Sequence, residues 1–168
     1  MVSSNKPKRS TYERALDMLE ARARAVEELR RLLIKKGEPQ PDVDEAIERL
    51  RAAGLLDDAN FAQQLARSKA VGAGLSRRRI QQELTKRGVA RSTADRAVEQ
   101  VFGDEGIDED ASIERVARKK LRTLAKVDEG TRKRRLYGFL ARRGYDNDDI
   151  QRVLRQVLAD VPVIGNTG

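Results

Sequence analysis

The side chains of this sequence that could do chemistry are mostly cations, and two runs of them stand where helices should begin. Ser76 is followed by arginines at 77–79, and Thr131 is followed by four cations at 132–135. A helix dipole disfavours each cation in its first turn by a few tenths to about 1 kcal/mol. The runs are therefore predicted to meet anionic groups outside their own helices, although a solvated helix face is the alternative for any single cation.

Most catalytic and metal-binding chemistry is excluded by residue types that are missing. Neither histidine nor cysteine occurs in the 168 residues, so the chain cannot build a Ser-His or Cys-His nucleophile, a zinc site of the usual kind or a disulfide. The acidic stretch 104–110 lacks the spacing of a calcium-binding loop. Gly72-Ala73-Gly74 is not preceded by a strand or followed by Gly-Lys-Ser/Thr, so it reads as a turn and not as a phosphate loop. We expect a binding protein with no cofactor, no metal and no enzymatic activity.

Charge is distributed unevenly along the chain. Lys and Arg number 35 against 27 Asp and Glu, a net charge of +8. Residues 1–57 carry 12 basic and 11 acidic side chains, residues 58–103 carry 9 and 4, and residues 104–168 carry 14 and 12. A surface patch with an excess of basic residues, as these counts predict, is typical of a protein that binds a polyanion or an acidic protein face. The candidate binding surface consists of Arg77, Arg78, Arg79, Lys86, Arg87, Lys119, Lys120, Arg122, Arg132, Lys133, Arg134, Arg135, Arg142 and Arg143.

These cations belong to a pattern that occurs three times. A leucine, one free position, two basic residues and a glycine end at Gly37, Gly88 and Gly144. Apolar residues recur 8 and 4 positions before each glycine and 6, 10 and 13 positions after it, which is the spacing of one helical face on either side. Each glycine is therefore predicted to end a helix in the left-handed conformation, with cations in the last turn where the dipole favours them. Gly88 and Gly144 should have positive φ, and alanine there should destabilise the module.

The repeat predicts an all-α chain of three tandem three-helix repeats that form an elongated, curved array. We divide it into a disordered basic head at 1–10, repeats at 11–56 and 57–103, an acidic linker with the third repeat at 104–159, and a flexible tail at 160–168. Helices are expected near 12–21, 25–36, 42–53, 58–71, 76–87, 92–102, 111–126, 131–143 and 148–158. Asp42, Asp57 and Ser92 are predicted to cap three of them.

No apolar run approaches the roughly 18 residues needed to cross a bilayer, and residues 1–10 lack the apolar core of a signal peptide. Absence of cysteine fits a reducing compartment. We therefore expect a soluble, cytoplasmic protein without a membrane partner.

Three segments resemble the signature segments of the RecX family of bacterial recombination regulators. They are Leu55-Leu56-Asp57-Asp58-x-x-Phe61-Ala62, then Gly72-x-Gly74 with Arg79-Ile80-x-x-Glu83-Leu84-x-x-x-Gly88-Val89, then Arg134-Arg135-Leu136-x-x-Phe139-Leu140-x-Arg142-Arg143-Gly144-Tyr145. The resemblance covers about residues 11–158 in the order of the family. The sequence departs from the family pattern in two places. Ala25 stands where the family often has Ser, and the head has no family counterpart.

The resemblance implies three three-helix repeats, no catalysis, and binding to the recombinase RecA as a monomer or filament. Family members lodge in the groove of the RecA filament on DNA, hinder its growth and strand exchange, and damp the SOS response. We expect DNA to be contacted as part of the filament or directly, and we expect this chain to be a monomer. The alternative is a direct DNA-binding protein of helix-turn-helix type. Against it, the expected third helices of the repeats mix acids with bases and are less basic than the second helices.

Overall fold

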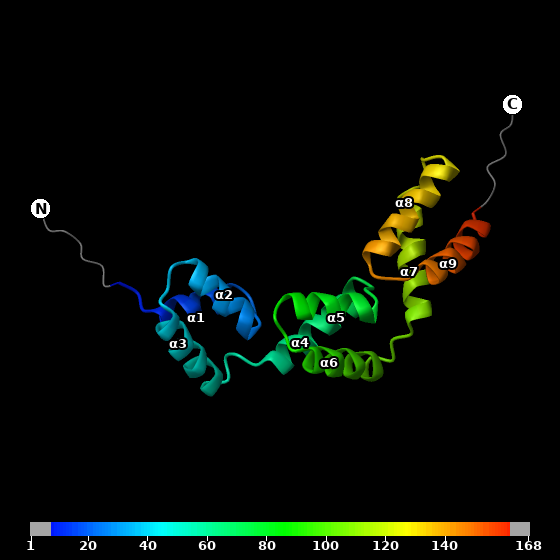
Figure 1. Cartoon of the computed structure of the whole chain (residues 1–168). Helices are drawn as coiled ribbons and strands as arrows, with labels where there is room; N and C mark the ends of the chain where they lie inside the picture. The colour runs from blue at the N-terminus through cyan, green and yellow to red at the C-terminus, as the bar shows by residue number, and fades with distance from the viewer. Residues whose placement is uncertain (1–7, 162–168) are drawn as a thin grey trace, which may run out of the picture.

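The computed structural model describes residues 8–161, and within them the chain is entirely helical apart from turns and loops. The predicted head and tail lie mostly outside this range. The helices are α1 (Thr11–Ala21), α2 (Val26–Lys35), α3 (Gln40–Ala52), α4 (Asp58–Arg67) with a π-helical turn η1 (Ser68–Gly72), α5 (Arg77–Lys86), α6 (Arg91–Asp104), α7 (Glu109–Arg122), α8 (Glu129–Arg142) and α9 (Asn147–Ala159). They form three successive groups of three along a curved, elongated path, as the sequence predicts (Figure 1).

Each group of three helices, called a module below, is built around its own apolar core. The residues 8 and 4 positions before each glycine and 10 and 13 positions after it are at most 1% exposed in all three modules: Leu29, Leu33, Ile47, Leu50, Ile80, Leu84, Val98, Val101, Leu136, Leu140, Leu154 and Val157. These residues divide among three clusters, one in each module. The helices that pack extensively against one another also belong to the same module. Each module therefore has its own core, and consecutive modules contact each other only over small areas, which are called joints below.

The three repeated glycines end their helices as predicted. Gly37, Gly88 and Gly144 have φ values of +87°, +86° and +90°. This left-handed region strains any residue that carries a Cβ atom, and it turns the chain sharply from the second helix of a module into the third. The glycines therefore fix the hairpin of helices that carries the basic residues.

Two predicted helix caps are wrong. The third helix starts at Gln40 with Pro39 as its N-cap, and no side chain caps it. Asp42 lies inside the first turn because Pro41 is tolerated there, where a helix needs no N–H from it. Similarly, α6 starts at Arg91 after Ala90, so that Ser92 is already helical. Asp57 does cap α4, accepting a hydrogen bond from the Asn60 N–H.

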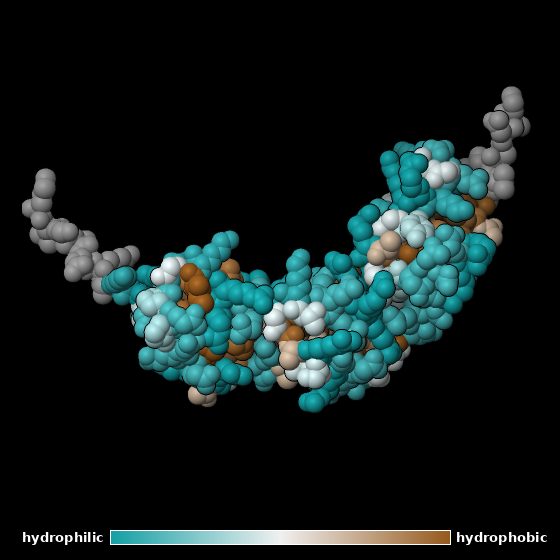
Figure 2. Space-filling view, in the orientation of Figure 1, coloured by the Kyte–Doolittle hydropathy of each residue, from teal (hydrophilic) through white to brown (hydrophobic). Residues whose placement is uncertain are grey.

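Two edges of the curved array differ in which helices they carry. The second helices α2, α5 and α8 follow its inner edge, and the third helices α3, α6 and α9 follow its outer edge (Figure 1). The surface visible in the same view is mostly hydrophilic, and its apolar residues gather within the modules (Figure 2). Cations on second helices are thus candidates for contacts with a partner that enters the concave side.

The elongated shape has a measurable consequence in solution. A compact folded chain of this length has a radius of gyration of about 15 Å. We expect small-angle X-ray scattering from the monomer to give a clearly larger value, because separate cores are strung along a curve. A value near 15 Å would mean that the modules collapse onto each other in solution.

Candidate functional site

Many of the predicted site residues lie at the joints between modules, and both joints contain the same kind of hydrogen bond. A carboxylate from the first residue of the next module accepts a hydrogen bond from the first N–H of the preceding second helix. Asp58 Oδ1 lies 2.9 Å from the Val26 nitrogen, and Glu109 Oε1 lies 2.9 Å from the Arg77 nitrogen. The carboxylates satisfy backbone donors that a helix start leaves free, and their charge matches the helix dipole.

The repeated glycines complete both joints. A Cβ atom on Gly88 would overlap the Cβ of Glu27 in α2, and one on Gly144 would overlap the Cβ of Arg79 in α5. Gly37, in the first module, has no atom within 4 Å of the same position. Two of the three glycines therefore do more than turn the chain, because each lets its module approach the first turn of the preceding second helix.

The joint between the second and third modules has additional direct hydrogen bonds. The Ser76 N–H donates to the carbonyl of Arg143 at 3.0 Å, and Arg143 Nε donates to the carbonyl of Ala73 at 3.1 Å. The buried hydroxyl of Tyr145 donates to the carbonyl of Gly74 at 2.7 Å. This joint is therefore fixed through backbone atoms of both modules.

The three arginines at the start of α5 all contact groups of this chain. Arg77 pairs with Glu99 at 3.1 Å and Glu109 at 3.4 Å, and its guanidinium lies 4.6 Å from the centroid of the Phe102 ring. Arg78 donates to the carbonyl of Gly144 at 3.3 Å, and Arg79 pairs with Glu83 at 3.4 Å. The incoming third module thus provides a structural reason for cations that their own helix disfavours.

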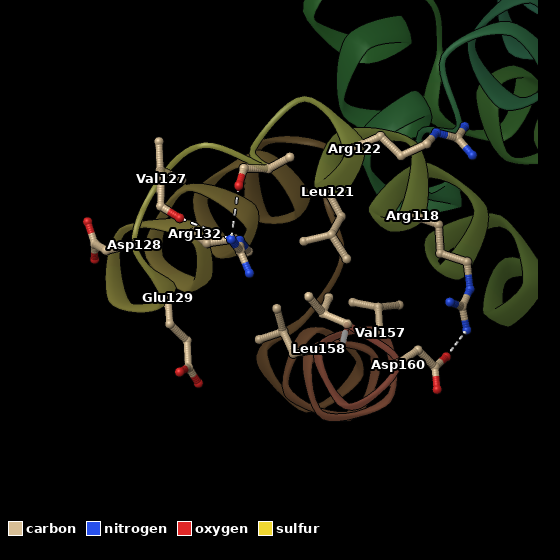
Figure 3. Close-up of a pocket in the computed structure, with 12 residues that line it drawn as sticks. Arg118, Leu121, Arg122, Val127, Asp128, Glu129, Arg132, Val157, Leu158 and Asp160 are labelled. Carbon is tan, nitrogen blue, oxygen red and sulfur yellow. Dashed lines mark hydrogen bonds and ion pairs between the residues drawn. The ribbon is translucent and has the colours of Figure 1, made fainter. Parts of the chain in front are cut away.

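Arg87 and Arg132 also have partners within the chain. Arg87 lies 3.7 Å from Glu28 of the first module. Arg132 donates to the carbonyls of Leu124 and Val127 at 3.3 and 3.0 Å, in the loop that follows α7 (Figure 3). A cation at the carboxyl end of a helix is favoured by the dipole of that helix, so Arg132 stabilises the turn from α7 into α8.

The remaining predicted residues have no carboxylate within 4.0 Å among residues 8–161. Seven of these eight are exposed and Lys120 is half-buried; the set, called the free cations below, is Lys86, Lys119, Lys120, Arg122, Lys133, Arg134, Arg135 and Arg142. Seven of them lie on α7 and α8, so the structure concentrates uncommitted positive charge on the third module. The predicted set does not include Arg115, another exposed cation of α7 that has no ion-pair partner within the described chain.

An open groove of about 710 Å³ lies at the far end of the third module (Figure 3). Leu121, Val157 and Leu158 line it, and an ion pair of 2.8 Å between Arg118 and Asp160 closes one side. Arg122 points away from the groove (Figure 3). Within the described residues, no group of three or more carboxylates is placed to hold a metal ion, and no helix is long and apolar enough to cross a membrane.

Tyr145 makes the strength of the second joint dependent on pH. Burial raises the pKa of its hydroxyl to about 12, whereas an unfolded chain has a tyrosine pKa of about 10. The stability that follows from this shift is fully present below pH 10 and is lost as the pH rises toward 12. We expect Tyr145→Phe to lower the free energy of unfolding by about 1–2 kcal/mol at neutral pH. That deficit should shrink between pH 10 and 12 in denaturation experiments on both proteins, and a constant deficit would contradict the assignment.

Comparisons with known proteins agree with the repeat found in the structure. Residues 12–50, 57–98 and 108–154 match the family models for the first, second and third three-helix domains of RecX. The regulatory protein RecX of Amycolatopsis mediterranei (strain U-32) is 37% identical over 164 residues, which cover 95% of this chain and 92% of that protein. The regulatory protein RecX of Mycobacterium avium (strain 104) is 40% identical over 150 residues, covering 87% and 84%.

The fold is also found in a solved structure. The crystal structure of RecX from Lactobacillus salivarius superimposes with a TM-score of 0.64 at 19% identity, and covers 89% of this chain and 95% of that one. Three matched domains in order and close relatives over nearly the full length lead to one conclusion: the chain belongs to the RecX family of regulatory proteins.

Proposed function

We propose that this protein is a non-enzymatic, cytoplasmic regulator that binds filaments of the recombinase RecA on DNA as a monomer. By occupying the filament it would limit filament extension and strand exchange, and thereby damp the SOS response. Membership of a family of regulatory proteins supports this function. The observation that carries it in this chain is the combination of an elongated curved array with uncommitted cations on the inner helix of its third module.

The free cations suggest how the filament would be recognised. A nucleoprotein filament presents the negative charge of its DNA within a sheath of protein, and cations on a long surface gain steering and salt-sensitive affinity from that field. The cations at the joints hold the modules in their relative positions. We therefore propose that α7 and α8 supply most of the electrostatic contacts, and that the arginines of α5 act mainly by fixing where the third module lies.

Cosedimentation distinguishes the proposed function from that of a protein that binds DNA alone. Purified protein is spun with preformed RecA filaments on single-stranded DNA, with and without ATP, and with the same DNA alone at about 150 mM salt. We expect the protein to pellet with filaments at concentrations where DNA alone retains little of it. Equal retention by DNA alone would favour the helix-turn-helix alternative, and no retention by either would refute the proposed function.

A further inference from the structure

An unusual set of cations gathers beside the second joint. The guanidinium of Arg143 lies 3.7 Å from the centroid of the Phe139 ring, and the ammonium group of Lys120 lies 5.3 Å from the same centroid. Arg143 uses its Nε atom to bind the carbonyl of Ala73. Its two terminal nitrogens have no hydrogen-bond partner in the part of the chain that the structure describes. One aromatic side chain is therefore contacted by two cations, one from α7 and one from the residue that ends α8.

Arg115 brings a third cation to the same place. Its Nη2 atom is 3.5 Å from the position that a Cβ atom on Gly74 would take, and Gly74 directly follows the residue that Arg143 binds. The charges of Arg115 and Arg143 also both act on the hydroxyl of Tyr145, lowering its pKa against the larger effect of burial. Arg115 therefore lies beside the same turn, at Ala73 and Gly74, that Arg143 contacts.

These three cations make no ion pair within the described chain, and the carboxylates that, after burial, raise the pKa of the same Tyr145 hydroxyl are those of Glu109 and Asp149. Arg115, Lys120 and Arg143 have no carboxylate within 4.0 Å among residues 8–161, in a structure where most other arginines are paired. Burial, and then the neighbouring Arg142, lower the pKa of Arg143. The guanidinium of Arg143 is partly buried, is repelled by a neighbour and has few hydrogen-bond acceptors. It therefore lacks a negatively charged partner, which charged groups removed from water normally have.

We propose that Arg115, Lys120 and Arg143 form a phosphate-binding site at the joint between the second and third modules. Guanidinium and ammonium groups from three positions offer the donors that the oxygens of a phosphate accept. The Gly72-Ala73-Gly74 turn contributes the Ala73 carbonyl that orients Arg143, and so takes part without acting as a phosphate loop. The ring of Phe139 packs against cations, so the site recognises the charge of a phosphate and does not stack a base.

The ligand we assign is a backbone phosphate of a nucleic acid, although a free phosphate offers the same chemistry. A bound phosphate would relieve the repulsion among Arg115, Lys120 and Arg143. These cations belong to the third module, and Arg143 also binds the turn of the second module at Ala73. Binding should therefore also stiffen the joint. The site goes beyond the proposed function, because it requires only a phosphate group and no recombinase.

The test measures binding of a fluorescent single-stranded oligonucleotide by anisotropy at several salt concentrations, without recombinase. The variant carries Arg115→Gln and Lys120→Gln, and both side chains make no hydrogen bond with the rest of the described chain. The matched control carries Arg96→Gln and Arg155→Gln, two exposed cations of the outer helices α6 and α9. Circular dichroism and thermal unfolding confirm that each variant folds.

We expect the site variant to bind more weakly than the control and to lower the slope of log K against log salt by about 0.7, because the site binds one phosphate and each phosphate contact contributes about 0.7 for a single strand. Equal slopes in the two variants, or no binding by the wild type, would overturn the proposal. Thermal unfolding in inorganic phosphate, against chloride of equal ionic strength, distinguishes the sources. If phosphate raises the Tm of the wild type but not of the site variant, free phosphate suffices as a ligand. If phosphate does not raise the Tm but the salt slope changes as expected, a nucleic acid is required.

Discussion

Alanine at Gly144 is expected to lower the free energy of unfolding by roughly 2–4 kcal/mol. About 1 kcal/mol of this comes from placing a Cβ atom in the left-handed region. A further 1–3 kcal/mol, approximately, comes from overlap with Arg79 and Ser76 at the joint, because close-packed atoms must shift to make room. Urea denaturation of wild type and variant measures the loss.

Gly37 provides a matched control for this prediction. It has the same conformation, with φ of +87° against +90°, but no atom lies within 4 Å of its Cβ position. Gly37→Ala should therefore lose only the backbone contribution of about 1 kcal/mol. Gly88→Ala, which would meet Glu27 across the first joint, should resemble Gly144→Ala. Equal losses at Gly37 and Gly144 would show that the glycines turn the chain but do not hold the modules together.

The largest effect on function is expected from reversing Lys133, Arg134 and Arg135 to glutamate. These side chains are exposed and free of ion pairs within the described chain, and because α8 begins at Glu129 they lie in its second turn, beyond the first turn where the helix dipole acts most. The fold should therefore survive. We expect the concentration needed to inhibit RecA strand exchange to rise by on the order of tenfold to a hundredfold, since steering and phosphate contacts are lost together.

The control for this triple reversal places the same charge change on the outer edge. Arg51, Arg96 and Arg155 are exposed residues of the third helices α3, α6 and α9. Their reversal should weaken inhibition only slightly. If both triple variants lose inhibition equally, affinity follows net charge and not the surface of α7 and α8; if neither does, the arginines of α8 are ordinary solvated residues.

The helical frame could be predicted because it depends on contacts within one module. Leu84, Gly88 and Val98 lie within 14 residues of each other, and their spacing alone fixes two amphipathic helices and the turn between them. Helix starts were less predictable. The third helix is expected from residue 42, but α3 begins at Gln40 because its first turn accepts Pro41.

The roles of individual cations could not be predicted because their partners are remote in sequence. Arg77 contacts Glu109 and Arg78 contacts Gly144, respectively 32 and 66 residues further along the chain. Reasoning from the dipole of one helix identified the arginines as unusual but could not show what they contact. Nothing in the sequence separates Arg132, which binds loop carbonyls, from the neighbouring Lys133, which is free.

Site-specific photo-crosslinking tests the proposed surface most directly, because it changes no charge. A photoreactive amino acid is introduced at Ala141, an exposed residue of α8, or at Ala53, an exposed residue that follows α3 on the outer edge. Each protein is irradiated with RecA filaments on DNA, and the products are separated by electrophoresis. Our account predicts a crosslink to RecA or to the DNA from position 141 and little from position 53. Efficient crosslinking from position 53 with none from position 141 would contradict it.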